Sequence, residues 1–158
     1  MDSTQIINKN VFEDYGNNIL ISPNRSYTEV TFENWCENYE FVKWYYKNGD
    51  KGDDFFSLVY RKAFRRNNFY PDYIIQLQND DIWIIEAKGG MTPEGESNNI
   101  DQFANNKFEA LKLYGEKHPE IKWGFVRAYA NQLFLSNTIW DEDLRNRTVW
   151  KPIEEFIK

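Results

Sequence analysis

Apolar and polar residues alternate most regularly along YPDYIIQLQNDDIWIIEAKGG, residues 70–90. Such alternation is typical of a β-strand, in which successive side chains point to opposite faces. Asn79, Asp80 and Asp81 interrupt the pattern with side chains that favour turns. The run therefore predicts a β-hairpin whose second arm has two faces: Ile82, Ile84, Glu86 and Lys88 on one, and Trp83, Ile85 and Ala87 on the other.

A helix and two strands are predicted before this hairpin. Between Phe32 and Tyr39, apolar residues recur at the i, i+3, i+4, i+7 spacing of an amphipathic helix, which we place over residues 27–38. FVKWYY, residues 41–46, and the segment 55–63 are predicted strands, with turn residues at 48–52. Residues 1–22 have only a weak pattern and are expected to form a connecting arm.

A loop and a long helix are predicted after the hairpin. GGMTPEGESNN is rich in glycine and polar residues, which favours a mobile loop over the hairpin's charged end. Asn98 and Asp101 resemble a helix cap, and an apolar stripe follows: Ile100, Phe103, Ala104, Phe108, Leu111 and Tyr114. Lys107 lies inside this stripe. It either covers apolar surface with its stem or contacts a phosphate.

The last third of the chain predicts another hairpin and a short helix. KWGFVRAY and QLFLS alternate as strands around Ala130 and Asn131. Pro152 fits the first turn of a C-terminal helix with Ile153, Phe156 and Ile157 on its apolar side. Together these elements predict an α/β fold: a central mixed sheet of about five to six strands flanked by helices, as a single domain over residues 1–158.

Composition narrows the class of protein. The 158 residues are 41% hydrophobic and 18% aromatic, which is typical of a folded domain, and no apolar run is long enough to span a membrane. No secretory signal is recognisable, so we expect a cytoplasmic protein. Cys36 and His118 are the only cysteine and histidine, which excludes an internal disulfide and a zinc finger. Cys36 lies in a helical apolar stripe and is expected in the core.

The charge of the chain gives two opposing indications about whether it binds nucleic acid. The net charge of −6 argues mildly against it, because DNA binding depends on neutralising phosphates. Locally, however, basic residues cluster before the hairpin: Arg61, Lys62, Arg65 and Arg66. This cluster is either a solvated surface or, with Lys107, a DNA-binding surface.

The predicted hairpin brings charged groups together only in one register. Asp72 and Ile74 share a face of the first arm. With a loop of three or five residues, antiparallel pairing sets Asp72 opposite Glu86 or Lys88 on their face. With an even-length loop Asp72 would point away, and no common site would form.

Two carboxylates and a lysine at one place are the groups that a hard divalent cation and a phosphate require. Mg²⁺ prefers oxygen ligands, and Asp72, Glu86 and the carbonyl of Ala87 could supply them. Such a metal polarises a phosphodiester and lowers the pKa of bound water. Two neighbouring carboxylates should hold the pKa of Lys88 up, so we expect Lys88 to orient water and offset charge, not to abstract a proton.

These residues carry a family resemblance. Pro71-Asp72 followed by Glu86-Ala87-Lys88 resembles the PD-(D/E)XK motif of the restriction-endonuclease-like nucleases. TEVTFENW, VKWYYKNGD, FYPDYII and IIEAKGG look more narrowly like the C-terminal endonuclease domain of the type III restriction subunit, over about residues 25–115.

The resemblance implies a fold, an activity and partners. It implies a restriction-endonuclease-like fold and DNA cleavage with Mg²⁺ or Mn²⁺, with Asp72 and Glu86 as metal ligands and Lys88 as the catalytic lysine. Glu29 matches an acidic residue that supports metal binding through water, although Ser26 and Glu29 also form a capping box. Family enzymes couple this domain to a translocase motor and a methyltransferase. No phosphate-binding loop of the G-x-x-x-x-G-K-[ST] type occurs here, so any motor is expected on another chain.

Three alternatives stay open from the sequence. The domain could bind DNA or a partner subunit and cut only with that partner or as a homodimer, because one active site cuts one strand. It could be an interaction module that docks through exposed aromatics of FVKWYY. It could be a two-carboxylate glycosidase, which leaves Lys88 without a role.

Overall fold

The computed structural model describes residues 9, 26–48, 56–62, 64–91 and 101–158. A six-stranded sheet lies at its centre, in the order β1-β4-β5-β6-β7-β8. Neighbouring strands are antiparallel except β5 and β6, which are parallel. This confirms the predicted α/β class with a mixed sheet. The strands are β1 (Val42–Lys47), β4 (Tyr73–Leu77), β5 (Ile82–Lys88), β6 (Ile121–Tyr129), β7 (Gln132–Ser136) and β8 (Lys151–Pro152).

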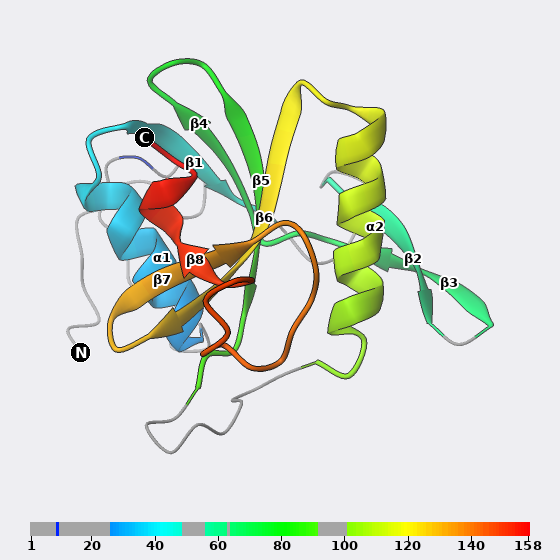
Figure 1. Ribbon diagram of the computed structural model, residues 1–158. Helices are drawn as coiled ribbons and strands as arrows, with labels where there is room; N and C mark the ends of the chain where they lie inside the picture. The colour runs from blue at the N-terminus through cyan, green and yellow to red at the C-terminus, as the bar shows by residue number, and fades with distance from the viewer. Residues whose placement is uncertain (1–8, 10–25, 49–55, 63, 92–100) are drawn as a thin grey trace.

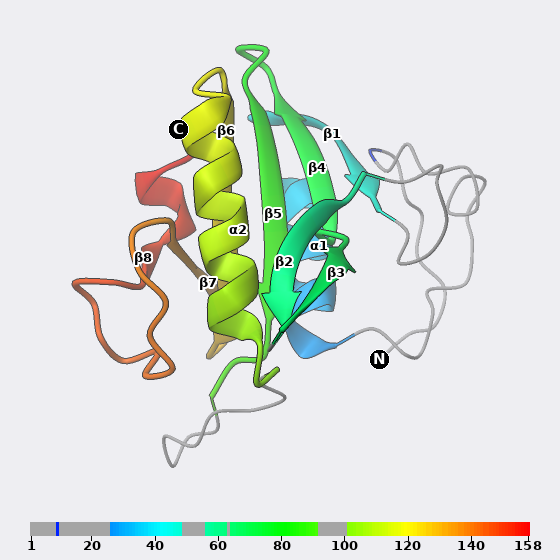
Figure 2. The same ribbon diagram turned by 90° about the vertical axis from the view of Figure 1, so that its right-hand side faces the viewer.

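Helices cover the two faces of the sheet (Figure 1). Helix α1 (Tyr27–Asn38) and the short 3₁₀ helix η2 (Ile153–Glu155) lie on one face, and α2 (Ala104–Lys117) lies on the other. A separate two-stranded ribbon of β2 (Leu58–Lys62) and β3 (Arg65–Phe69) lies beside α2 (Figure 2). Among the described residues no helix is long and apolar enough to cross a membrane.

Each face of the sheet has its own hydrophobic core, and β5 contributes to both. On the α1 side, Phe32 of the helix packs with Trp83 and Ile85 of the strand. On the α2 side, Phe108 packs with Ile84. The alternation read from the sequence is therefore confirmed, because neighbouring residues of β5 enter opposite cores.

Local signals in the sequence account for most element boundaries. Ser26 Oγ accepts a hydrogen bond from Glu29 N at 3.1 Å, so α1 starts where its cap predicts. The β6–β7 turn has left-handed backbone at Ala130 (φ 51°) and Asn131 (φ 61°), as the primed turns of tight hairpins require. Cys36 is fully buried in α1, as predicted.

Several sequence predictions need correction. Strand β3 was not predicted, and it pairs with β2 outside the main sheet. Pro152 belongs to β8 and not to a helical turn, and the C-terminal helix is only the short η2. Helix α2 begins at Ala104 without a side-chain cap. The 1–22 arm, apart from residue 9, the turn at 49–52, and the 92–100 loop with Asn98 and Ile100 lie outside the described residues.

Candidate functional site

The register of the β4–β5 hairpin satisfies the predicted geometric condition. Ile74 pairs with Ile84 and Gln76 with Ile82, so the paired residue numbers sum to an even value. Continuing this register sets Asp72 opposite Glu86. The turn is stabilised by Asp80, whose φ is 70°, and by a hydrogen bond from Asp81 N to Asn79 Oδ1 at 3.0 Å.

Two hydrogen bonds connect Asp72 to the Glu86-Ala87 segment. Asp72 N donates to Glu86 Oε1 at 3.1 Å, and Ala87 N donates to Asp72 Oδ2 at 2.9 Å. Glu86 is only 5% exposed. The backbone thus fixes one carboxylate beside the other, which places two negative charges together where little water can screen them.

Lys88 extends the site towards α2. Its Nζ lies 3.0 Å from Glu86 Oε2 and 3.6 Å from Asp101 Oδ2, and the residue is 9% exposed. Asp101 also accepts from Phe103 N at 2.8 Å and pairs with Lys107. The sequence predicted that Lys88 lies between Glu86 and Asp72. The second carboxylate in contact with Lys88 is instead Asp101.

Lys107 is held on the inner side of α2. Its Nζ pairs with Asp101 and lies 5.5 Å from the ring centroid of Tyr60 and 5.8 Å from that of Phe69. The stem of Lys107 thus reaches along apolar surface while its charge meets a carboxylate and two aromatic faces. Of its two expected roles, the covering role agrees with these contacts.

Lys47 extends the site on the α1 side. Its Nζ donates to Glu29 Oε2 at 2.9 Å and to Asp72 Oδ1 at 3.4 Å, and it lies 4.7 Å from the ring centroid of Tyr73. The Glu29 carboxylate is thus connected to Asp72 through Lys47, while the Glu29 backbone N–H donates to the capping Ser26 Oγ. The sequence analysis did not single out Lys47.

The charged groups form one row around the end of the sheet. Signs alternate along it except at one junction, where Asp72 and Glu86 are neighbours of like charge. That junction is the place in the row where an added cation would relieve repulsion. The members in order are Glu29, Lys47, Asp72, Glu86, Lys88, Asp101 and Lys107.

Burial and neighbouring charges shift the pKa values at this junction. Burial, followed by the charge of Asp72, raises the pKa of Glu86 well above its usual range, against the lowering effect of Lys88. Burial lowers the pKa of Lys88, but Glu86 and Asp101 outweigh burial and raise it. Lys88 therefore stays charged, as the sequence predicted. At Lys47, Asp72 and Glu29 likewise outweigh burial and raise the pKa.

The donor set suits a hard cation only in part. Asp72 and Glu86 supply adjacent carboxylates, which is the usual protein contribution to Mg²⁺. No group of three acidic, histidine or cysteine side chains able to hold a metal occurs in the described part of the chain. A bound Mg²⁺ would thus take its remaining ligands from water, substrate or backbone carbonyls such as that of Ala87.

Asn48 fixes the position of the segment before Asp72. Its Nδ2 donates to Pro71 O at 2.9 Å and to Phe56 O at 2.7 Å, and its backbone N donates to Asp72 O at 2.8 Å. Its Oδ1 accepts from Phe56 N at 3.2 Å. A buried asparagine with these contacts joins the end of β1 to the Pro71-Asp72 segment, a role that sequence reasoning missed.

Arg127 fixes the chain that follows Lys88. It is 0% exposed, and burial lowers its pKa to about 10. The guanidinium carbon lies 5.5 Å and 5.2 Å from the ring centroids of Trp140 and Trp150. Its nitrogens donate to backbone oxygens of two loops: Gly89 at 2.6 Å, Gly90 at 3.4 Å, Asp141 at 3.2 Å and Glu142 at 2.8 Å.

The basic residues expected at DNA lie on the β2–β3 ribbon. Arg61, Arg65 and Arg66 are exposed, and none has an ion pair with a described residue. They are separate from the charged row. Lys107 connects the two regions, because it contacts Tyr60 of the ribbon and Asp101 of the row.

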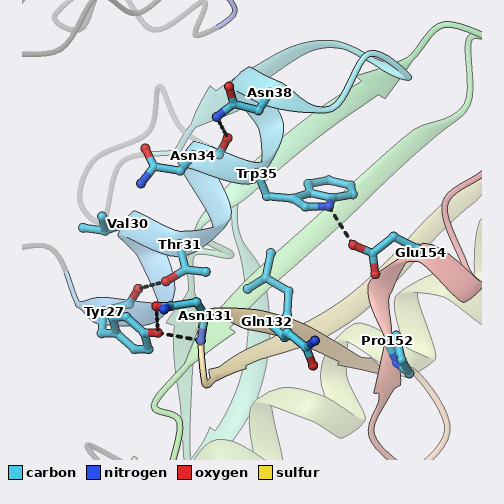
Figure 3. Close-up of a pocket in the computed structure, with 11 residues that line it drawn as sticks. Tyr27, Val30, Thr31, Asn34, Trp35, Asn38, Asn131, Gln132, Pro152 and Glu154 are labelled. Atoms are coloured by element: carbon cyan, nitrogen blue, oxygen red, sulfur yellow. Dashed lines mark hydrogen bonds between the residues drawn. The ribbon is translucent and has the colours of Figure 1, made fainter.

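A cavity lies away from the charged row. A volume of about 630 Å³ opens between α1, the β6–β7 turn and η2 (Figure 3). Its one charged lining residue, Glu154, accepts a hydrogen bond from Trp35 Nε1 at 3.3 Å, and Tyr27 is bonded to Asn131. Neither Asp72, Glu86 nor Lys88 lines it, so we assign the chemistry to the charged row.

The interaction-module alternative loses its structural basis. Within FVKWYY, Tyr45 is fully buried, and Phe41, Trp44 and Tyr46 are partly buried, so the expected exposed aromatic surface is absent from this segment. Cys36 and His118 cannot act as a nucleophilic pair, because Cys36 lies in the core on the α1 side, whereas His118 follows α2 on the opposite face (Figure 1).

Comparison with family models, with curated protein sequences and with solved structures gave no match.

Proposed function

We propose that this chain is a divalent-metal-dependent nuclease domain that hydrolyses phosphodiester bonds in DNA. The observation that carries the proposal is the like-charge junction of Asp72 and Glu86, flanked by the half-buried Lys47 on one side and the buried Lys88 on the other. Adjacent carboxylates, one of them buried and with a raised pKa, are typical of sites that work on protons or cations.

The residues of the row divide the work of phosphodiester hydrolysis. Asp72 and Glu86 would hold Mg²⁺ or Mn²⁺, which supplies polarisation of the phosphate and activation of water. Lys88 stays protonated between Glu86 and Asp101, so it offsets the negative charge that develops on phosphorus. Lys47 orients Asp72 from the other side, with Glu29 keeping that lysine in place.

The order of elements supports a restriction-endonuclease-like fold. Apart from the β2–β3 ribbon, which comes between β1 and β4, the order is a helix, a strand, a hairpin carrying the motif, a second helix and a parallel strand: α1, β1, β4–β5, α2 and β6. The Pro71-Asp72 and Glu86-Ala87-Lys88 motifs fall at adjacent ends of β4 and β5. This is the arrangement that the resemblance to type III restriction endonuclease domains implies.

A second candidate function is a domain of the same fold that binds DNA and cuts only with a motor, a methyltransferase partner or a second copy. One observation favours it: all four carboxylate oxygens of Asp72 and Glu86 already accept hydrogen bonds within the chain. A metal would have to displace some of these donors. Binding of a partner or of DNA could provide that rearrangement.

The test is cleavage of supercoiled plasmid with Mg²⁺ or Mn²⁺. We expect the wild type to nick or cut it, and Asp72→Asn and Lys88→Met to reduce the rate at least about 100-fold, because each removes a charge that acts on the reacting phosphate. The matched control is the exposed pair of Lys43 on β1 and Asp80 in the β4–β5 turn, 3.8 Å apart. Lys43→Met and Asp80→Asn should cut like the wild type.

The outcomes separate the two candidates. Activity that survives Asp72→Asn and Lys88→Met would contradict the assigned site. If the wild type is inactive, calorimetry with Mg²⁺ decides: binding that is lost in Glu86→Ala supports the partner-dependent domain. Absence of both metal binding and DNA binding would contradict both candidates.

A further inference from the structure

The β2–β3 ribbon concentrates positive charge on an otherwise acidic chain. From residue 55 to residue 71 the sequence contains no aspartate or glutamate, although the net charge of the chain is −6. Arg61 pairs with Arg66 across the ribbon, and the next pair, Lys62 with Arg65, is again basic. Like charges directly opposite one another destabilise a strand pair. Such a ribbon gains stability when an anion binds between the paired cations.

The exposed face of the ribbon is continuous with a groove. Val59, Arg61, Arg66 and Asn68 are all exposed, and their pairing in register puts them on one face. A groove of about 570 Å³ lies between this face and α2, lined by Asn105 and other side chains from both elements. The groove presents the paired guanidinium groups, the ammonium of Lys117 and two amides, which bind phosphate oxygens, with Glu109 as its one carboxylate.

Phe64 is at the tip of the ribbon. Its side chain is 105% exposed, the most exposed of the large hydrophobic residues described. It lies in the turn that joins β2 to β3, and with Arg61, Arg65 and Arg66 it lines a small pocket. An exposed aromatic ring beside these cations is suited to contact bases while the cations contact phosphates.

The root of the ribbon is adjacent to the charged row. Tyr60 and Phe69, on the inner face of the ribbon, lie over Lys107, which pairs with Asp101, which contacts Lys88. Phe69 also packs against Phe125 of β6, with ring centroids 6.4 Å apart. A nucleic acid held by the ribbon is therefore brought to the side of the molecule that carries Lys88.

We propose that the β2–β3 ribbon is a duplex-DNA clamp: its tip enters a groove of the duplex, Phe64 contacts the bases, and Arg61 and Arg66 hold one phosphate backbone. The inference rests on the proposed function in taking DNA as the substrate. A two-stranded β-ribbon matches the width of the major groove, whereas a single strand offers no groove for the tip. Duplex DNA is therefore the form that this geometry fits.

The experiment measures binding without cleavage. The affinity for a fluorescent duplex of about 20 base pairs is measured in EDTA at several salt concentrations. Arg61→Ala with Arg66→Ala should lower the slope of log affinity against log salt by about 2, because two phosphate contacts are lost. Phe64→Ala should weaken binding about tenfold at an unchanged slope, and Phe64→Trp should retain binding.

Matched controls separate the ribbon from general charge and surface effects. Lys43→Ala with Lys151→Ala removes the same number of positive charges from exposed sites elsewhere, and Ile139→Ala removes an exposed apolar side chain away from the ribbon. Both controls should leave the salt slope within about 0.5 of the wild-type value. Thermal unfolding of every variant checks the fold.

The outcomes keep this inference distinct from the proposed function. Equal loss of affinity in the arginine variant and its lysine control, or single-stranded DNA bound as tightly as duplex, would overturn the clamp. Plasmid cleavage that is unaffected by the ribbon variants would overturn the clamp and leave the nuclease intact. Binding through the ribbon by a chain that never cuts would support the clamp and contradict the nuclease.

Discussion

Asn48 is a single residue on which the position of Asp72 depends. The amide and backbone of this buried asparagine contact Phe56, Pro71 and Asp72 at the edge of the site. Asn48→Ala leaves Pro71 O and the backbone N–H and C=O of Phe56 without their side-chain partner, while the backbone hydrogen bond to Asp72 O survives, so the free energy of unfolding should fall by about 2–3 kcal/mol. Cleavage should fall further than folding alone explains, because the Pro71-Asp72 segment loses the side-chain bond that holds Pro71.

Denaturant unfolding and plasmid cleavage at a temperature where the variant is folded measure the two effects. The exposed Asn38, which donates only to Asn34 O in its own helix, provides the control. Asn38→Ala should change stability by less than about 0.5 kcal/mol. If folded Asn48→Ala protein cuts at the wild-type rate, Asn48 has a structural role only.

Arg127 is the second residue whose replacement should have a large effect. Its fork of donors reaches four carbonyl oxygens, and a lysine cannot reproduce that geometry. Arg127→Met should lower the free energy of unfolding by about 3 kcal/mol, and Arg127→Lys by somewhat less. Thermal unfolding measures this, with exposed Arg145→Lys as the control. A change below about 1 kcal/mol in Arg127→Met would contradict the anchoring role.

At the residue scale, the sequence predicts which charged residues meet across the hairpin, but not the residues that hold them in position. Asp72 and Glu86 could be predicted because a strand period and a turn length fix their relative positions. Lys47, Asn48, Asp101 and Arg127 could not, because each acts through contacts with residues distant in sequence, and a lone polar residue in a strand or loop has no periodic signature. Glu29 was placed near the site correctly, but its link through Lys47 was not foreseen.

At the element scale, hydrophobic periodicity predicts amphipathic helices and strands. It misses a strand whose conformation depends on pairing with another strand. Helix α1 and strands β1, β4, β5, β6 and β7 follow the expected pattern. Strand β3, with the sequence RRNNF, has a single apolar residue. Its strand conformation comes from pairing with β2 and from Phe69 packing on Phe125. Such tertiary support leaves no local signal.

Asp101, just before helix α2, contacts Lys88 at the end of β5, and the effect of this contact can be tested. Asp101→Asn keeps an acceptor for Phe103 N but removes the charge that contacts Lys88 and Lys107. Stability should fall by less than about 1 kcal/mol, because the backbone hydrogen bond survives. The cleavage rate should fall about tenfold, because Lys88 loses one of the two groups that fix its position.

Thermal unfolding and single-turnover cleavage distinguish this role from the hydrogen bond to Phe103 N alone. Asp101→Ala removes both the acceptor and the charge. If Asp101 only accepts from Phe103 N, Asp101→Asn should cut at the wild-type rate while Asp101→Ala is destabilised. Equal loss of cleavage in the two variants agrees with positioning of Lys88.

On the scale of the whole molecule, the charged row connects the two layers that flank the sheet. Glu29 comes from α1 and Lys107 from α2, and Asp72, at the sheet's end, lies between them. Folding buries Glu86 beside Asp72, which the β4–β5 register sets opposite it. The stability of the whole domain should then include a repulsive contribution from this junction, as is common where function opposes stability.

The repulsion between Asp72 and Glu86 predicts how neutralising Glu86 changes the stability of the domain. Because its pKa is raised, the folded chain favours the protonated form, so at neutral pH the ionised group opposes folding. Glu86→Gln retains an acceptor for Asp72 N, and Lys88 keeps Asp101 as a partner. The variant should therefore be more stable than the wild type in EDTA, by about 1 kcal/mol.

Divalent metal should reverse this order. At Mg²⁺ concentrations about 100 times the dissociation constant, the wild type should gain about 2.7 kcal/mol, and Glu86→Gln should gain far less because one ligand charge is missing. Thermal unfolding with EDTA, Mg²⁺ and Ca²⁺ measures both, and Asp80→Asn on the exposed turn is the control. If Glu86→Gln is less stable than the wild type without metal, the junction is not repulsive, and the observation on which we base the metal site fails.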